Sequence, residues 1–317
     1  MMSELNDCTD AFVGALAELA ASDERVFAVT NDSLGAAKLA GFRKRFPDRL
    51  IQVGPAEKDM IGIAAALAKD GRLPFVCGES YFTARQLEQI HADLGCSQPN
   101  LKICRVGSDR AGGRRDAPRH SSDDPAWARV VDDLCVIVPA DPLETEQAVR
   151  RIAAYDGPVY LSLSRRPVPI VHRFDYGFEI GRAAILRDGT DLTLISSGSR
   201  VSWTLGAAEA LAGDGIEARV LNMSTIRPLD SVAIERAARE TGAIITVEDY
   251  SVFGRLGGAV AQVVLHKHPV PVRLLDVPGA LAPSGSAPWL LDCFGLTVSA
   301  IRNAALDLLE VTEKRRD

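Results

Sequence analysis

The chain has 317 residues, of which 47% are apolar and 25% charged, a balance typical of a soluble globular protein with room for two domains. The net charge of −6 argues against nucleic-acid binding, and no apolar run reaches the ~18 residues of a membrane span. The polar N-terminus lacks a signal-peptide pattern, and the six cysteines are scattered without a CxxC pair, so we expect a reducing, cytoplasmic setting.

Apolar, strand-like runs alternate with helical segments through the first half of the chain. Strands are predicted at residues 26–30, 49–53, 100–106, 134–139 and 158–164. Helices are predicted at 9–21, 85–94 and 142–153, and in a segment that starts near Glu57 and continues past Leu67. Because strands that are apolar on both faces form parallel sheets between helices, this pattern predicts a doubly wound α/β domain over residues 1–167.

A stretch rich in proline and aromatic residues then predicts a linker over residues 168–182. The alternation resumes beyond it and predicts a second doubly wound α/β domain over residues 183–317. Its strands are expected at 191–198, 217–223, 243–249 and 270–277, and its helices at 200–212, 230–240, 255–266 and 297–311.

Glu57, in "QVGPAEKDM", lies in the first turn of a helix that is apolar on nearly every side. A helix of that kind is expected to be buried. One interpretation of Glu57 is a carboxylate that satisfies the free amide donors of the helix start. The other is a functional carboxylate, because sites in open α/β sheets lie where the strands end. The local sequence favours the two equally.

Two further polar stretches follow predicted strands. The loop at residues 108–124 contains Asp116 and His120, and it is either a disordered connection or a functional loop. Arg165 follows the strand at 158–164, where an arginine suits either a phosphate or carboxylate ligand or a surface position. His266-x-His268 has no third ligand nearby, so no metal site is predicted from the residues of this chain.

Taken in order, several segments resemble the C-terminal half of transketolase. They are "RLIQVGPAEKDMIGIAAALAKDGRLPFV", "ARQLEQIHADLG", "VIVPADPLETEQAVR", "GPVYLSLSRRPVP", "ARVLNMSTIRPLD" and "GAIITVEDYSVFGRLGGAVAQVV". The resemblance covers almost the whole chain and implies a pyrimidine-binding domain followed by a transketolase C-terminal-like domain. The Gly-Asp-Gly signature of the family's diphosphate domain has no match. The resemblance therefore implies a split transketolase, whose separate N-terminal subunit binds the diphosphate of thiamine diphosphate through Mg²⁺.

The resemblance also implies roles for individual residues. Glu57 matches the carboxylate that hydrogen-bonds N1′ of the cofactor's aminopyrimidine, which requires a desolvated acid that shares a proton. Asp116 and His120 match the Asp-x-x-x-His pair that contacts the hydroxyls of the ketose donor, and His120 is expected to move protons there. Arg165 matches the arginine that pairs with a sugar phosphate, and Asp32 an aspartate near the entrance to the cofactor.

Departures from the family pattern concern the aromatic loop and the phosphate contacts. Tyr81 is the best match to the aromatic residue that stacks on the pyrimidine, with Phe82 as its neighbour. The serine that binds the acceptor phosphate falls on Ala36 or Ala37, and a family histidine falls on Ser108. These losses indicate a non-standard sugar substrate.

The function that the resemblance implies is transfer of a two-carbon ketol unit from a ketose donor to an aldehyde acceptor. By family analogy, a heterotetramer with two copies of each chain is expected. Alternatives are the β subunit of a 2-oxo acid dehydrogenase or acetoin-type enzyme, deoxyxylulose-type chemistry, and a catalytically silent structural or regulatory subunit. "RHSSDD" is only a partial match to the His-Ser-Gln stretch of the dehydrogenases. The intact Glu57, Asp116 and His120 argue against a silent subunit, whereas the altered aromatic loop does not.

Overall fold

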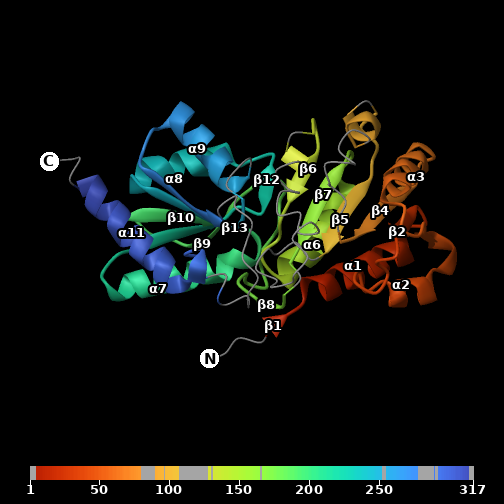
Figure 1. Ribbon diagram of the computed structural model, residues 1–317, viewed down its shortest axis with the longest axis horizontal. Helices are drawn as coiled ribbons and strands as arrows, with labels where there is room; N and C mark the ends of the chain where they lie inside the picture. The colour runs from red at the N-terminus through yellow and green to blue at the C-terminus, as the bar shows by residue number, and fades with distance from the viewer. Residues whose placement is uncertain are drawn as a thin grey trace. The chain divides into compact units, whose positions relative to one another are not determined.

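The computed structural model of the protein describes residues 5–79, 90–95, 97–106, 128–129, 131–164, 166–251, 255–277, 289 and 292–313. The chain divides into two units, with the division between Ile180 and Gly181, inside the stretch predicted as a linker. Each unit is an α/β layer structure and is described by itself (Figure 1).

The first unit is built on a parallel sheet with the strand order β6-β7-β5-β4-β2-β3. Its strands are β2 (Val26–Thr30), β3 (Leu50–Gln52), β4 (Leu73–Gly78), β5 (Lys102–Val106), β6 (Cys135–Ile137) and β7 (Val159–Leu163). Every residue of β4, β5, β6 and β7 is buried, as expected for a sheet that is covered on both faces.

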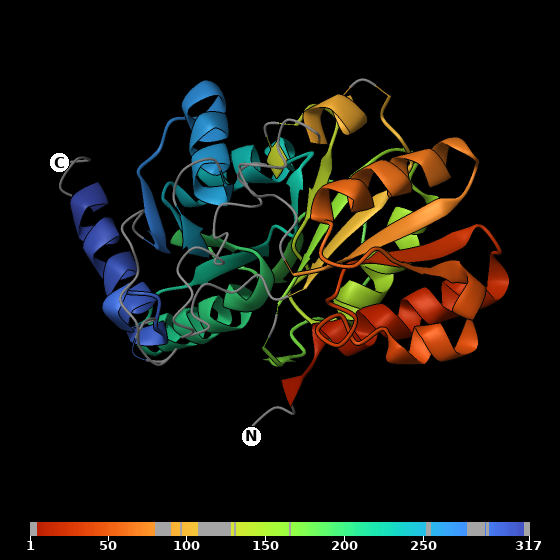
Figure 2. The same cartoon turned by 45° about the vertical axis from the view of Figure 1, so that its right-hand side comes forward.

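Helices cover both faces of this sheet. The helical segments of the first unit are α1 (Cys8–Ser22), α2 (Ala40–Arg45), a 3₁₀ turn (Pro47–Arg49), α3 (Glu57–Lys69), a π turn (His91–Gly95) and α6 (Pro142–Ala154). Helices α1 and α6 lie side by side on one face, and α3 packs against β4 on the other (Figure 2). A short antiparallel ribbon joins β1 (Leu5–Asn6) to β8 (Val168–Pro169).

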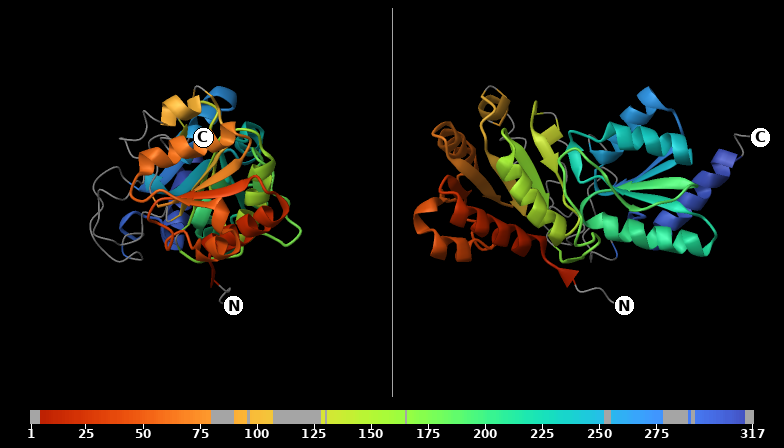
Figure 3. Two further views of the ribbon diagram at one scale, coloured as in Figure 1. Left: turned by 90° about the vertical axis from the view of Figure 1, so that its right-hand side faces the viewer. Right: turned by 180° about the vertical axis from the view of Figure 1, so that it is seen from behind.

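The second unit has the strand order β14-β13-β10-β11-β9, in which only the edge strand β9 is antiparallel. The strands of this sheet are β9 (Ala184–Arg187), β10 (Leu192–Ser196), β11 (Ala218–Asn222), β13 (Ile244–Ser251) and β14 (Val272–Val277). The short strand β12 (Thr225–Arg227) follows β11 in the chain and does not join this sheet. The helical segments of the second unit are a 3₁₀ turn (Gly198–Arg200), α7 (Val201–Gly213), α8 (Ser231–Thr241), α9 (Leu256–Lys267) and α11 (Val298–Glu313). Helix α7 packs with α11, and α8 with α9, as the view from behind also shows (Figure 3).

The predicted α/β class is confirmed in both units, and each predicted strand has a counterpart among the described residues. The predicted helix at 85–94 lies mostly outside the described residues. Helix α2 and strand β9 were missed because they are short: six and four residues are too few for a periodic pattern to register.

Candidate functional site at the first sheet edge

Glu57 is the first residue of α3, and a tight turn brings it to the carboxyl edge of the first sheet. Strand β3 pairs in parallel with β2, and the Val53 amide continues the pairing by donating to the Thr30 carbonyl at 2.9 Å. Gly54 then reverses the chain with φ +71°, a backbone conformation that a side chain would strain. Glu57 therefore starts its helix beside the end of β2, the position at which open α/β sheets bind ligands.

The Glu57 carboxylate does not cap its own helix. The residue at the N-cap is Ala56, which makes no side-chain cap hydrogen bond. Among the described residues, the Glu57 side chain makes one hydrogen bond, in which Asn31 Nδ2 donates to Oε1 at 3.4 Å. Among the described residues, no amide of the helix start donates to the Glu57 carboxylate, and its second oxygen accepts no hydrogen bond. Its place in the first turn of α3 still suits the positive end of the helix dipole.

Asn31 was not singled out from the sequence, although it directly follows a buried strand. The same argument that selected polar residues at other strand ends would have found it. Its neighbour Asp32, expected near the cofactor entrance, is exposed on the loop after β2. The fold thus brings Asn31, rather than Asp32, into contact with Glu57.

Helix α3 is buried on one side only. Met60, Ile61 and Ala64 are buried in the first unit, whereas Ile63 and Leu67 stay partly exposed. The expectation that the apolar helix is buried all round is therefore wrong within this chain. Ile63 and Leu67 therefore lie on a second side of α3 that the first unit covers only in part.

Five of the predicted site residues lie outside the described residues: Tyr81, Phe82, Asp116, His120 and Arg165. Their proposed roles consequently remain predictions. Among the residues described, no group of three or more His, Cys, Asp or Glu side chains is arranged to hold a metal ion.

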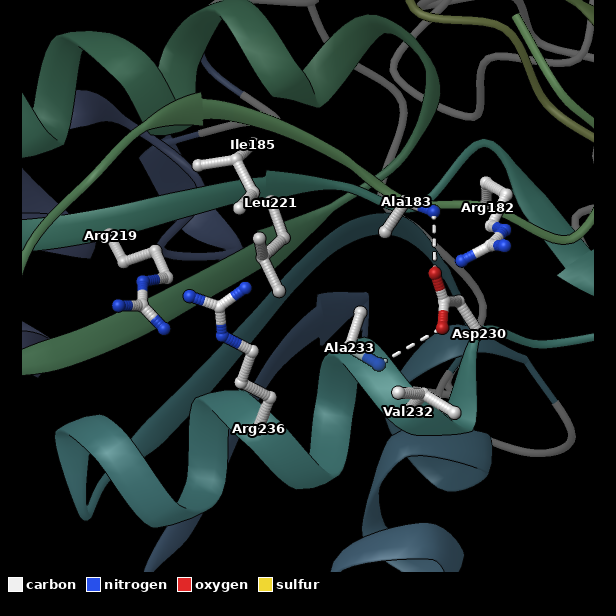
Figure 4. Close-up of a pocket in the computed structure, with 9 residues that line it drawn as sticks. All are labelled: Arg182, Ala183, Ile185, Arg219, Leu221, Asp230, Val232, Ala233 and Arg236. Atoms are coloured by element: carbon white, nitrogen blue, oxygen red, sulfur yellow. Dashed lines mark hydrogen bonds between the residues drawn. The ribbon is translucent and has the colours of Figure 1, made fainter.

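A small hollow of about 200 Å³ lies between β9, β11 and the start of α8 in the second unit (Figure 4). Arg219 and Arg236 extend into it from β11 and α8, but the carboxylates of Asp188 and Glu240 pair with them. Asp230 caps α8 by accepting from the Ala233 amide at 2.9 Å. Because carboxylates of the same chain pair with both arginines, we assign no ligand to this hollow.

A buried carboxylate also occurs in the second unit, at Glu248 of β13. Burial raises its pKa to about 7, although the nearby Arg255 guanidinium acts in the opposite direction. Glu248 Oε1 accepts from the Gly257 amide at 2.9 Å, and Oε2 lies 3.9 Å from Arg255 Nε. This carboxylate fastens β13 to the start of α9 and has a partner for each oxygen.

A buried histidine fastens the last segment of the first unit to α6. His172 Nδ1 lies 2.9 Å from Asp141 Oδ2, and Tyr176 donates to Glu144 Oε1 at 3.0 Å. Burial lowers the pKa of His172, but the Asp141 hydrogen bond and the negative charge of Glu144 outweigh it, so the pKa is raised overall. The cluster explains why the chain beyond β8 stays attached to the first unit.

Two family models match the chain, one on each side of the division between Ile180 and Gly181. Residues 6–170 match the family model of the transketolase pyrimidine binding domain, and residues 181–301 match that of the transketolase C-terminal domain. The chain belongs to the transketolase family. Within that family, the edge that carries Glu57 belongs to the pyrimidine-binding domain.

Several relatives of this transketolase chain are named as subunits. An apulose-4-phosphate transketolase subunit of Phocaeicola vulgatus is 39% identical over 98% of this chain and 100% of its own length. The 6-deoxy-6-sulfo-D-fructose transketolase subunit SqwH of Clostridium sp. is 37% identical over 96% of this chain and 94% of its own. A solved structure described as "Split gene transketolase, inactive beta4 tetramer" superimposes with a TM-score of 0.90 at 33% identity, covering 97% of this chain and 99% of that one.

These matches confirm the resemblance seen in the sequence: the chain belongs to the transketolase family, and the two relatives named above are transketolase subunits. No helix among the described residues combines the length and apolar character needed to cross a membrane.

Proposed function

We propose that this chain supplies the pyrimidine-binding half of a thiamine-diphosphate-dependent transketolase that moves a two-carbon ketol unit from a ketose to an aldehyde. The observation that carries the proposal is Glu57, which stands at the carboxyl edge of the pyrimidine-binding domain without serving as a helix cap. A carboxylate at that edge, with an oxygen that accepts no hydrogen bond from the residues described, suits a protonated ring nitrogen of a ligand.

The described residues fit one end of the cofactor. Glu57 Oε1 has the Asn31 amide as its donor, and Oε2 accepts no hydrogen bond from a described residue, which leaves it for N1′ of the aminopyrimidine. When bound, thiamine diphosphate supplies the nucleophilic centre that accepts the two-carbon unit. In this chain Glu57 holds the proton at N1′, a contribution typically worth about 10²–10⁴-fold in rate.

The remaining site assignments rest on the family resemblance. Tyr81 or Phe82 stacks on the pyrimidine, and Asp32 lies near the cofactor entrance. Asp116 and His120 bind the donor hydroxyls, and His120 transfers a proton there. The diphosphate and its Mg²⁺ are held by a separate N-terminal subunit, and two copies of each chain form a heterotetramer.

The substrate class is an anionic, non-standard ketose. The relatives named above are called transketolases of apulose 4-phosphate and of 6-deoxy-6-sulfo-D-fructose, one a phosphate and the other a sulfonate. Arg165 is the proposed partner of this anionic group, because a guanidinium binds both phosphate and sulfonate oxygens in pairs.

The test is to mix this chain with the purified partner subunit, thiamine diphosphate and Mg²⁺, and to screen ketose donors with aldehyde acceptors. We expect turnover only when both chains are present, with phosphorylated or sulfonated ketoses as the best donors. Native mass measurement of the active mixture is expected to give two copies of each chain. Turnover by this chain alone would contradict the split assignment.

A second donor class belongs in the same screen. A 1-deoxy-D-xylulose-5-phosphate synthase of Desulfotalea psychrophila is 33% identical over 95% of this chain, which spans 48% of that enzyme. Pyruvate tests this alternative, because it donates a two-carbon unit only with loss of carbon dioxide. Release of carbon dioxide in place of aldehyde exchange would favour deoxyxylulose-type chemistry over transketolase chemistry.

A further inference from the structure

Asn31 presents its amide nitrogen to Glu57 because the backbone fixes the other end of the side chain. The Ser33 amide donates to Asn31 Oδ1 at 2.9 Å, and only the carbonyl oxygen of a carboxamide accepts such a bond. Nδ2 is therefore the atom that faces Glu57, 3.4 Å from Oε1. Asn31 is only 4% exposed, so its orientation is held by packing as well.

We propose that Asn31 is the positioning residue for Glu57: it holds Oε1 and leaves Oε2 to contact the cofactor's aminopyrimidine. This inference rests on the proposed function, since it requires Glu57 to be the carboxylate that meets the cofactor.

The chemistry of an amide suits this position. An aspartate in the place of Asn31 would accept the same Ser33 bond, but it would set a second negative charge beside Glu57. The 3.4 Å separation is long for a hydrogen bond, and contacts in catalytic sites commonly shorten once the ligand is bound. Asn31 is anchored in the loop while Glu57 is half-buried, so Glu57 is the side chain that adjusts.

The test compares Asn31→Asp with a control at the preceding residue, Thr30→Val. The Thr30 hydroxyl is buried without a hydrogen-bond partner among the described residues, so its replacement by a methyl group leaves the Glu57 contacts intact. In the reconstituted two-chain enzyme, calorimetric titration with thiamine diphosphate and the pH–rate profile are both measured. For Asn31→Asp we expect cofactor binding about 10- to 100-fold weaker and an acid limb displaced to higher pH. Thr30→Val should match the parent enzyme in cofactor affinity and in its pH–rate profile.

A double-mutant cycle decides whether Asn31 acts through Glu57. In the Glu57→Gln background, Asn31→Asp is expected to change cofactor affinity less than about twofold, because the carboxylate it serves is gone. The inference would be overturned if Asn31→Asp weakened cofactor binding equally in the parent and in the Glu57→Gln background. It would also be overturned if Asn31→Asp alone left the cofactor affinity and the pH–rate profile unchanged. If Glu57→Gln itself binds and turns over like the parent, the proposed function fails and takes this inference with it.

Folding of the variants is followed by thermal unfolding. Asn31→Ser is the second variant should Asn31→Asp unfold, because a serine keeps the local turn but is too short to reach Glu57. It is expected to weaken cofactor binding in the same direction. Parent-like binding in a folded Asn31→Ser variant would equally overturn the inference.

Discussion

Two glutamates at strand–helix junctions, Glu57 in the first unit and Glu248 in the second, show opposite uses of a carboxylate. Glu248 is 2% exposed, and both its oxygens face donors from its own chain, the Gly257 amide and Arg255. Glu57 is half-buried and, among the described residues, receives one long hydrogen bond, from Asn31. A carboxylate whose acceptors are occupied within the chain holds the fold together, whereas one with a spare oxygen at a sheet edge remains available for a ligand.

The largest effect is expected from Glu57→Gln, because the change removes the acid while keeping the shape of the side chain. Turnover of the reconstituted enzyme should fall about 10²–10⁴-fold. The melting temperature of the isolated chain should stay unchanged, since the one hydrogen bond that Glu57 receives from the described part of the chain is long, at 3.4 Å. Steady-state kinetics and thermal unfolding check both parts, and parent-like turnover would end the assignment of Glu57 as the cofactor's acid.

Glu248→Ala should lower the stability of the chain, which Glu57→Gln is expected to leave unchanged. Removing one partner of a buried ion pair leaves Arg255 without its carboxylate, which typically costs about 3–5 kcal/mol of unfolding free energy. Denaturant unfolding measures this loss. Glu235→Ala is the control, because Glu235 pairs with Arg239 on the exposed side of α8 and should change stability little. Equal stability of the two variants would show that Glu248 is not a structural group.

Gly257→Ala tests the close approach of α9 to the Glu248 carboxylate. An added methyl group would come within 2.9 Å of Thr246 Oγ1 and 3.2 Å of Glu248 Oε1, so crowding should cost about 1–3 kcal/mol of unfolding free energy. Gly14→Ala in α1 is the matched control, since no atom other than those of its chain neighbours and its own helix backbone lies within 4 Å of the new methyl group. There the gain in helix propensity should stabilise the chain by about 1 kcal/mol. A neutral Gly257→Ala would mean that α9 can move away from Glu248 at little cost.

The smallest expected effect is a pH dependence of stability that comes from His172. Its pKa is raised in the folded chain above the ordinary value of 6.5. The stability it contributes is therefore fully present below about pH 6.5 and is lost as the pH rises through the folded value. Unfolding free energies of the parent and of His172→Gln should differ most at acid pH and converge on the alkaline side.

His266→Gln supplies the comparison for that experiment, because His266 lies exposed at the end of α9. As an exposed substitution it should change the unfolding free energy by less than about 0.5 kcal/mol. A gap between His172→Gln and the parent that widens with increasing pH would contradict the cluster of His172 with Asp141 and Glu144.

Much of the fold could be predicted from the sequence, because the buried strands and amphipathic helices carry strong local periodicity. The strand predicted at 134–139 shows this, since β6 lies within that range and all of its residues are buried. Helix α2 and strand β9 escaped prediction because each is short and β9 lies at a sheet edge with Ile185 exposed. Such segments are held by tertiary contacts rather than by their own pattern.

The sequence by itself determined the α/β class, the order of the elements and the position of Glu57 at the start of an apolar helix. It left Glu57 equally balanced between a helix cap and a functional acid, because both interpretations require a carboxylate at the same place. Only the tertiary structure decided that Glu57 is no cap, since the parallel pairing of β3 with β2 carries it to Asn31, 26 residues earlier in the chain. Local sequence does not record which side chain faces another across a sheet edge, and that contact is where the chemistry of this carboxylate is set.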